Sequence, residues 1–149
     1  MPYFTRQVAP NGSLLIIAFV GVSHARASAL IAASQPVPPA VQITGLVDTG
    51  ASGTCVDPSV LSKLQLSATG TIQVNTPTTG IQPISADQFD VSVVIPSAPG
   101  HPPLAHLTIP VMAAELLVAQ GFHALIGRDV LRGCMLIYDG VNGLFSLAY

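Results

Sequence analysis

The sequence predicts a small all-β domain, either a closed barrel or a sandwich, with one to three short helices. Short apolar runs rich in β-branched and aromatic residues recur along the chain, and turn residues separate them. Helical patterns are few and short, so strands should form most of the core. The chain has 149 residues, of which 50% are hydrophobic, and this length suits one domain around one core.

Charged residues make up only 8% of the chain, and five basic against seven acidic residues give a net charge of −2. Soluble proteins carry roughly 25% charged residues, so part of the apolar surface should be buried against a partner. Without a basic patch, we expect no nucleic-acid binding. We also expect no membrane partner, because no apolar run reaches the roughly 20 residues that span a bilayer.

The two cysteines, Cys55 and Cys134, are too few for a disulfide framework and lack the spacing of a metal site. Reduced, buried thiols are the simpler expectation, and a single disulfide is the alternative. The sequence leaves this choice open.

The N-terminal 39 residues should contain a strand, a helix and a proline-rich connector. The run Leu14–Val22 holds good strand formers. Ser23 can cap a helix that continues to Ala33, and the prolines in Gln35–Pro39 favour an extended connector. The apolar run also resembles a signal peptide, with small residues at 25–27. We therefore expect a cytoplasmic protein, or an exported one if residues 1–27 act as a signal peptide.

The rest of the chain predicts further strands and two short helices. Residues 57–64 should form a helix with Asp57 as N-cap and Pro58 at its first position, and residues 129–132 should form another that ends at Gly133. The segment 113–119 fits either a helix or a loop. The predicted strands cover residues 40–47, 71–76, 81–84, 89–95, 107–112, 125–126, 134–138 and 144–149.

The most informative stretch is the Asp48–Ser52 segment, Asp-Thr-Gly-Ala-Ser, directly after the apolar strand predicted at 40–47. A carboxylate at the end of a buried strand is costly to bury unless other groups bind it. The glycine and small residues that follow let backbone N–H groups approach that carboxylate. Asp-Thr-Gly by itself also fits a turn whose aspartate caps its own backbone.

This segment resembles the active-site loop of aspartic peptidases, in which Asp-Thr-Gly follows an apolar strand. A second element supports the resemblance, since Ala124–Ile126 is followed by Gly127 and a predicted helix. The turn Pro77–Gly80 stands where this family places its flap. Over residues 40–149, the order and spacing match the retropepsin-like group. The resemblance implies a single-lobe, closed β-barrel-like peptidase core that pairs as a homodimer, within a single domain of residues 1–149.

The resemblance also assigns roles to individual residues. It makes Asp48 the catalytic carboxylate, with Thr49 hydrogen bonding to the partner's loop and Gly50 donating its N–H to the carboxylate. Gly127 would pack behind the loop, where a side chain would not fit. Ala51 and Ser52 would further support the active-site loop. Thr78, Thr79 and Gly80 would form the flap tip over the substrate, and Arg128 and Asp129 would belong to the structure behind the site.

The sequence departs from the retroviral pattern at one position. In retroviral enzymes, the arginine that corresponds to Arg128 pairs with an aspartate four residues after the catalytic one. That position is Ser52 here. The partner of Arg128 is therefore open, and Asp57 and Asp129 are the candidates.

The resemblance implies an aspartic endopeptidase, a hydrolase that uses no metal or other cofactor. Two carboxylates about 3 Å apart share one proton, so one can activate water while the other protonates the substrate carbonyl. The chain has one Asp-Thr-Gly, so the expected partners are a second copy and a peptide bound as an extended strand. The alternative is a catalytically silent, retropepsin-like dimer that serves as a binding or scaffold module.

A serine hydrolase is a weaker alternative. Residues Gly50–Gly53 approach the nucleophile-elbow pattern, but Thr54 stands where that pattern requires its second glycine. Four histidines could act as bases, yet none is singled out by its position.

Overall fold

The computed structural model describes residues 1–75, 83–115 and 118–149, and their strands form two sheets. The larger sheet has the order β2-β3-β8-β4-β7-β6-β5, and the smaller has the order β1-β10-β9. The helices are α1 (His24–Ala32), α2 (Pro58–Lys63) and α3 (Arg128–Leu131), with a 3₁₀ turn at Val118–Gln120. The strands are β1 (Tyr3–Gln7), β2 (Leu15–Val22), β3 (Val41–Val47), β4 (Cys55–Val56), β5 (Gly70–Val74), β6 (Ile84–Ile95), β7 (Leu104–Ala113), β8 (Ala124–Ile126), β9 (Met135–Asp139) and β10 (Leu144–Ala148).

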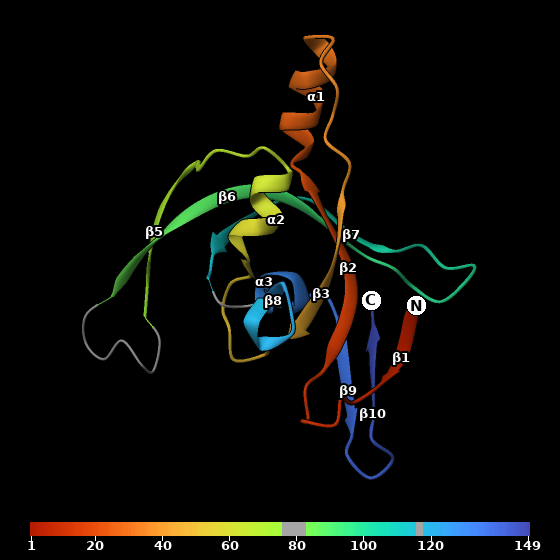
Figure 1. Ribbon diagram of the computed structural model, residues 1–149. Coiled ribbons are helices and arrows are strands. Elements are labelled where there is room, and N and C mark those ends of the chain that lie inside the picture. Colours follow the sequence, from red (N-terminus) through yellow and green to blue (C-terminus); the bar gives the residue numbers. More distant parts are fainter. Residues whose placement is uncertain (76–82, 116–117) are drawn as a thin grey trace.

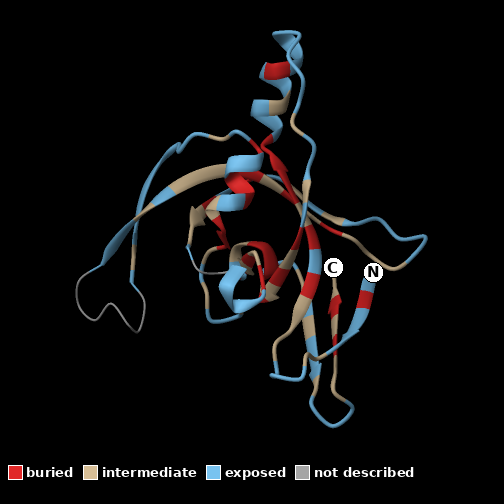
Figure 2. Ribbon diagram, viewed as in Figure 1, coloured by how far each residue is buried: buried red, intermediate tan, exposed pale blue. Residues whose placement is uncertain are grey.

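Six strands of the larger sheet close into a barrel because β2 pairs with both β3 and β6 (Figure 1). Along β2, Ile16, Ala18 and Val20 are buried whereas Ile17 is exposed, which is the alternation of a strand with one face in a core. Figure 2 shows that the buried residues gather on the barrel strands and the helices beside them. The strand predicted in the run Leu14–Val22 and the predicted closed barrel are both confirmed.

Two neighbouring strands of the barrel end at the same place. β3 and β8 run parallel, with Val47 opposite Ile126, so their carboxyl ends lie side by side. The N–H of Asp48 donates to the carbonyl of Ile126 at 3.0 Å. Short β4 continues this region, because it runs antiparallel to β8 and parallel to β7. The loops after β3 and β8 therefore meet at one edge of the barrel.

The smaller sheet joins the two ends of the chain. Its central strand is β10, which pairs antiparallel with β1 on one side and with β9 on the other. Phe4, Phe145 and Leu147 face the core and are buried. Figure 1 shows both termini in this sheet, beside β2. The C-terminal hairpin was predicted from the sequence, but β1 was not, because only Phe4 in that polar strand is buried.

The helices follow the caps that the sequence predicts. The Ser23 hydroxyl accepts from the N–H of Arg26 at the start of α1, and the Asp57 carboxylate accepts from the N–H of Ser59 at the start of α2. α3 begins at Arg128, one residue before the predicted start. Within the described ranges, no helix has the length and apolar character needed to cross a membrane.

The predicted break within the sixth strand is wrong. The sequence predicts separate strands at 81–84 and 89–95, whereas Ile84–Ile95 is one continuous strand. The polar residues between the two apolar runs stay in the strand because β5 pairs with residues 84–88. Pairing with a neighbour thus overrides a local preference for a turn.

Candidate active site

The carboxylate of Asp48 is held by its own loop. Its Oδ1 accepts hydrogen bonds from the N–H groups of Gly50 at 2.8 Å and Ala51 at 3.3 Å. Asp48 is half-buried, while Thr49 and Gly50 are exposed. The predicted donation from Gly50 is therefore present. This geometry also occurs in an ordinary turn capped by aspartate, so the surrounding residues must distinguish the two interpretations.

The loop after β8 packs directly behind the Asp48 loop. A Cβ atom added to Gly127 would lie 2.6 Å from both the carbonyl carbon and the oxygen of Gly53. The backbone of Gly127 is extended, with φ of −86°, so lack of space alone requires glycine here. The N–H of Arg128 also donates to the carbonyl of Ala51 at 3.0 Å. The predicted close packing at Gly127 is confirmed.

A buried hydrogen-bond network ties these two loops together. The Asp129 carboxylate accepts from the Thr54 N–H at 2.9 Å and from the Thr54 hydroxyl at 2.7 Å. The same hydroxyl accepts from the N–H of Gly127 at 3.1 Å. Thr54 is only 1% exposed and Asp129 is half-buried, so the network joins the buried start of β4 to the loop after β8.

The structural role of Thr54 was not predicted from the sequence. There, Thr54 was noted only as a mismatch to a serine-hydrolase motif. A signal was nevertheless present: Thr54 is a hydroxyl residue between the small residues of the loop and the apolar pair Cys55–Val56. A hydroxyl at the entry to a buried strand needs a hydrogen-bond partner.

The structure identifies a partner for Arg128 that differs from both carboxylates proposed from the sequence. Its Nη1 donates to the carbonyl oxygen of Thr49 at 3.1 Å. Asp57 instead caps α2, and Asp129 binds Thr54. Arg128 therefore supports the active-site loop through its backbone, and this bond does not require an aspartate at the position of Ser52.

Two open hollows lie near the Asp48 loop, and only the first is lined by residues of the loop itself. One of about 470 Å³ lies between this loop and the strands β5 and β7, and its lining includes Ser52, Gly53 and Asp129. The other, of about 710 Å³, is lined by residues of β4, β6 and β8, including Cys55 and Leu125. Both hollows are open to solvent, so side chains of the described residues do not fill the space beside the loop.

The turn predicted as the flap lies between β5 and β6. β5 and β6 form an antiparallel hairpin in which Val74 pairs with Ile84. Thr78, Thr79 and Gly80, the predicted tip residues, lie outside the described residues.

Cys55 lies on the floor of the larger hollow, within a second apolar cluster. Burial, together with the Asp129 and Asp48 carboxylates, raises the pKa of its thiol to about 11. The thiol therefore stays neutral near pH 7. Among the described residues, neither Cys55 nor Cys134 forms a disulfide. The cluster around Cys55 consists of Phe122, Leu15, Leu46, Met112, Ala114 and Leu125.

In the part of the chain that the structure describes, no group of three or more His, Cys, Asp or Glu side chains could hold a metal ion. The nearby His123 is occupied, since its Nδ1 accepts from the N–H of Thr44 at 3.2 Å. Asp48 is half-buried and directly follows β3 at the edge of the barrel.

The architecture and the site define a class: a one-lobed β-barrel with a single Asp-Thr-Gly loop supported by a glycine loop. A solved structure of this class matches the chain, the crystal structure of a retropepsin-like aspartic protease from Rickettsia conorii. The two are 20% identical, with a TM-score of 0.60 over 97% of this chain and 89% of that chain. The chain therefore has a retropepsin-like fold, as the sequence resemblance implied. No protein-family model and no curated protein sequence matches it.

Proposed function

We propose that this protein is an aspartic endopeptidase that hydrolyses peptide bonds with a pair of Asp48 carboxylates, one from each copy of a homodimer. The main support for this proposal is that the Asp48 loop is held in two ways. Its carboxylate is bound by Gly50, and its backbone is held by the Gly127–Asp129 segment beside open hollows. A loop that only turns the chain needs neither the second loop nor the adjacent open space.

The proposed chemistry follows from two carboxylates at close range. Two like charges about 3 Å apart cannot both ionise, so the pair holds one shared proton, as in other aspartic proteases. The ionised member accepts a proton from a water molecule, and the protonated member donates to the peptide carbonyl oxygen. The tetrahedral intermediate then collapses as the leaving nitrogen takes up a proton. Activity should therefore be highest at mildly acidic pH and fall when the shared proton is lost.

The need for a second copy follows from the sequence. The chain contains one Asp-Thr-Gly, and its other aspartates are not followed by Thr-Gly or Ser-Gly. A two-fold axis places a residue opposite its own counterpart, so an axis beside Asp48 would bring the two carboxylates together. The exposed Thr49 would then meet the partner's loop, where its hydroxyl can hydrogen bond.

The surface beside Thr49 supports an interface there. Thr49 lines a shallow hollow together with Leu136 of β9 and Leu147 of β10. In the described residues β9 pairs only with β10, and its Met135 and Ile137 are each 54% exposed. An apolar edge strand of this kind favours pairing with another chain. In this sheet β10 already has a neighbour on each side, whereas β9 and β1 are the edge strands, and β9 is the more apolar of the two.

The alternative scaffold function requires a cleft closed by its own side chains. The open hollows of about 470 and 710 Å³ near the loop argue against this. A pure scaffold also gains no stability from two facing carboxylates, which repel one another when both are ionised.

The proposal is tested with a mixed peptide library at mildly acidic pH, with wild type and Asp48→Asn protein side by side. Asparagine keeps the shape of the side chain but cannot act as a general base. We expect peptide cleavage by the wild type and a loss of at least about 10²-fold in rate for the variant. Circular dichroism and sedimentation should show the same fold and assembly for both. Comparable cleavage by the two proteins would mean that Asp48 is not the catalytic group.

A further inference from the structure

The larger hollow beside the loop has an apolar floor and an acidic rim. Two exposed carboxylates, Asp87 on β6 and Glu115 after β7, lie at its edge. No basic side chain of the described residues lines it. The apolar side chains of its lining are Cys55, Pro58, Val74, Ile84, Ala86, Phe89, Met112, Ala113, Ala114 and Leu125.

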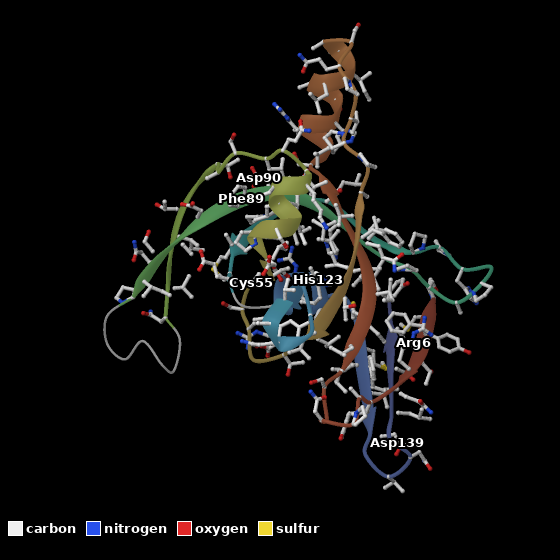
Figure 3. All side chains as sticks on the ribbon, viewed as in Figure 1. Arg6, Cys55, Phe89, Asp90, His123 and Asp139 are labelled. Carbon is white, nitrogen blue, oxygen red and sulfur yellow. The ribbon has the colours of Figure 1, made fainter. Side chains whose placement is uncertain are left out.

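This hollow adjoins the place where the reaction would occur. Leu125 in its floor pairs with Leu46, two residues before Asp48. Cys55, also in the floor, lies close enough to Asp48 for that carboxylate to raise its thiol pKa. Figure 3 shows Cys55 and Phe89 on the side of the barrel away from Arg6 and Asp139. A peptide bound over Asp48 would therefore place a neighbouring side chain in this hollow.

The smaller hollow lacks a comparable charge. Its polar lining includes the neutral amides of Gln73, Asn75 and Gln88. Its one charged lining residue is Asp129, whose two carboxylate oxygens already accept from Thr54. Any selection of substrate charge by the cleft should therefore come from the larger hollow.

A long basic side chain matches both parts of this lining. The aliphatic stem of lysine or arginine can lie along apolar side chains while its charged head stays in contact with water. At the rim, that head would meet Asp87 and Glu115. An acidic side chain in the same place would be repelled, and a neutral side chain of similar length would gain only the apolar contact.

Building on the proposed peptidase function, we propose that the larger hollow is a subsite for a lysine or arginine side chain, and that Asp87 and Glu115 determine this specificity. The substrates would then be peptides with a basic residue close to the cleaved bond. Exposed ion pairs contribute modestly, so the two carboxylates together should raise kcat/KM about tenfold for lysine over methionine, which has a similar stem and no charge.

The test uses three peptides that differ only at the residue placed in this hollow, which is lysine, methionine or glutamate. We expect wild type to prefer lysine to methionine about tenfold and to cleave the glutamate peptide most slowly. The Asp87→Asn/Glu115→Gln double variant should cleave the lysine and methionine peptides equally. Higher salt should reduce the wild-type preference, because it screens exposed charges. An unchanged preference in the double variant would overturn the proposal.

Asp90→Asn is the control, because it removes one negative charge from β6, as Asp87→Asn does. Asp90 lines a different hollow, together with Ser23 and Arg26, and Figure 3 shows it next to Phe89 on β6. We expect this variant to keep the wild-type preference for lysine. A loss of preference in Asp90→Asn equal to that of the double variant would show that net charge, and not this hollow, selects the substrate.

A binding measurement separates failure of this inference from failure of the peptidase proposal. Fluorescence anisotropy with labelled peptides and Asp48→Asn protein reports affinity without cleavage. Tighter binding of the lysine peptide, lost in a triple variant that also carries Asp87→Asn and Glu115→Gln, would support the subsite even if wild type cleaved nothing. Cleavage without any such difference in affinity or rate would refute the subsite and leave the peptidase proposal intact.

Discussion

At the residue scale, the hydroxyl of Thr54 should contribute more to stability than its size suggests. It donates to Asp129 and accepts from the N–H of Gly127 in a buried setting. Thr54→Val keeps the shape but removes one hydrogen bond to Asp129 and leaves the N–H of Gly127 without its acceptor, so the free energy of unfolding should fall by about 1–3 kcal/mol. Urea denaturation measures this change.

Thr54→Ser is the matched control for the hydroxyl. It keeps both hydrogen bonds and loses one methyl group, so its cost should stay near about 1 kcal/mol. A serine variant less stable than the valine variant would show that the methyl group, and not the hydroxyl network, is the larger contribution of Thr54.

A second residue-scale prediction concerns the carboxylate that caps α2. Burial alone would raise the pKa of Asp57, but hydrogen bonds from Ser59 and Val118 and the nearby His123 outweigh it and lower the pKa. A carboxyl with a lowered pKa in the folded state stabilises the protein fully above its unfolded value of about 3.9. That stabilisation is lost as the pH falls through the folded pKa.

The pH dependence can be isolated with Asp57→Asn, because asparagine caps a helix about as well but does not titrate. The difference in unfolding free energy between wild type and this variant should shrink below about pH 4. Asp57→Ala, which removes the cap, should cost about 1 kcal/mol at pH 7. Parallel denaturation curves for wild type and Asp57→Asn from pH 7 to pH 3 would contradict the assignment.

The residues whose roles depend on local sequence were predicted, and those that depend on distant neighbours were not. The N–H donation from Gly50 lies two residues from its acceptor, and the need for glycine at 127 follows from a short motif. The partner of Arg128 could not be deduced, because the Thr49 carbonyl lies 79 residues away in sequence. Every residue has a backbone carbonyl, so residue type cannot indicate which carbonyl accepts the hydrogen bond.

At the element scale, the contact between the two active-site loops should tolerate no side chain at Gly127. Gly127→Ala would place a methyl group 2.6 Å from the Gly53 backbone, so overpacking should cost about 1–3 kcal/mol and displace the Asp48 loop. Stability is measured by denaturation and loop displacement by peptidase rate. Gly133→Ala is the matched control, because an added Cβ there meets no atom within 4 Å and should change stability by less than about 0.5 kcal/mol. Equal effects of the two substitutions would contradict this account.

Strands that depend on long-range pairing were harder to predict than strands with apolar runs. β1 is mostly polar and exists because it pairs with β10 at the other end of the chain. β4 has two residues and depends on β7 and β8 for its backbone partners. Sequence periodicity detects burial of side chains, so it found β2 and β3 and missed these pairings.

At the scale of the whole molecule, the fold class was predictable, whereas the pair of strands that closes the barrel was not. The number of short apolar runs indicated an all-β fold, and the spacing of two motifs indicated its type. Closure depends on β2 meeting β6, with Phe19 opposite Val94. The sequence of neither strand indicates that the two strands pair. β2 therefore belongs to the same core as β3 and β6, although the sequence resemblance began at residue 40.

The first test of the homodimer is a substitution in β9, the edge strand that we propose as part of its interface. Ile137→Lys places a charge on exposed β9, so the monomer should fold normally while dimers dissociate. Sedimentation should show this shift, and peptidase activity should fall with it. Ile31→Lys on α1 is the matched control, because Ile31 is 67% exposed and lies on the arm that projects away from the smaller sheet (Figure 1). It should keep both assembly and activity.

A mixing experiment tests whether each copy supplies one aspartate. Asp48→Asn chains should pair with wild-type chains and produce heterodimers that hold a single catalytic carboxylate. With nine variant chains for each wild-type chain, random pairing leaves about 10% of wild-type chains in fully wild-type pairs. Activity at constant wild-type concentration should therefore fall to about 10%, and wild type alone should lose specific activity on dilution. A protein that sediments as a monomer, cleaves at full rate and is unaffected by the variant would contradict the shared active site.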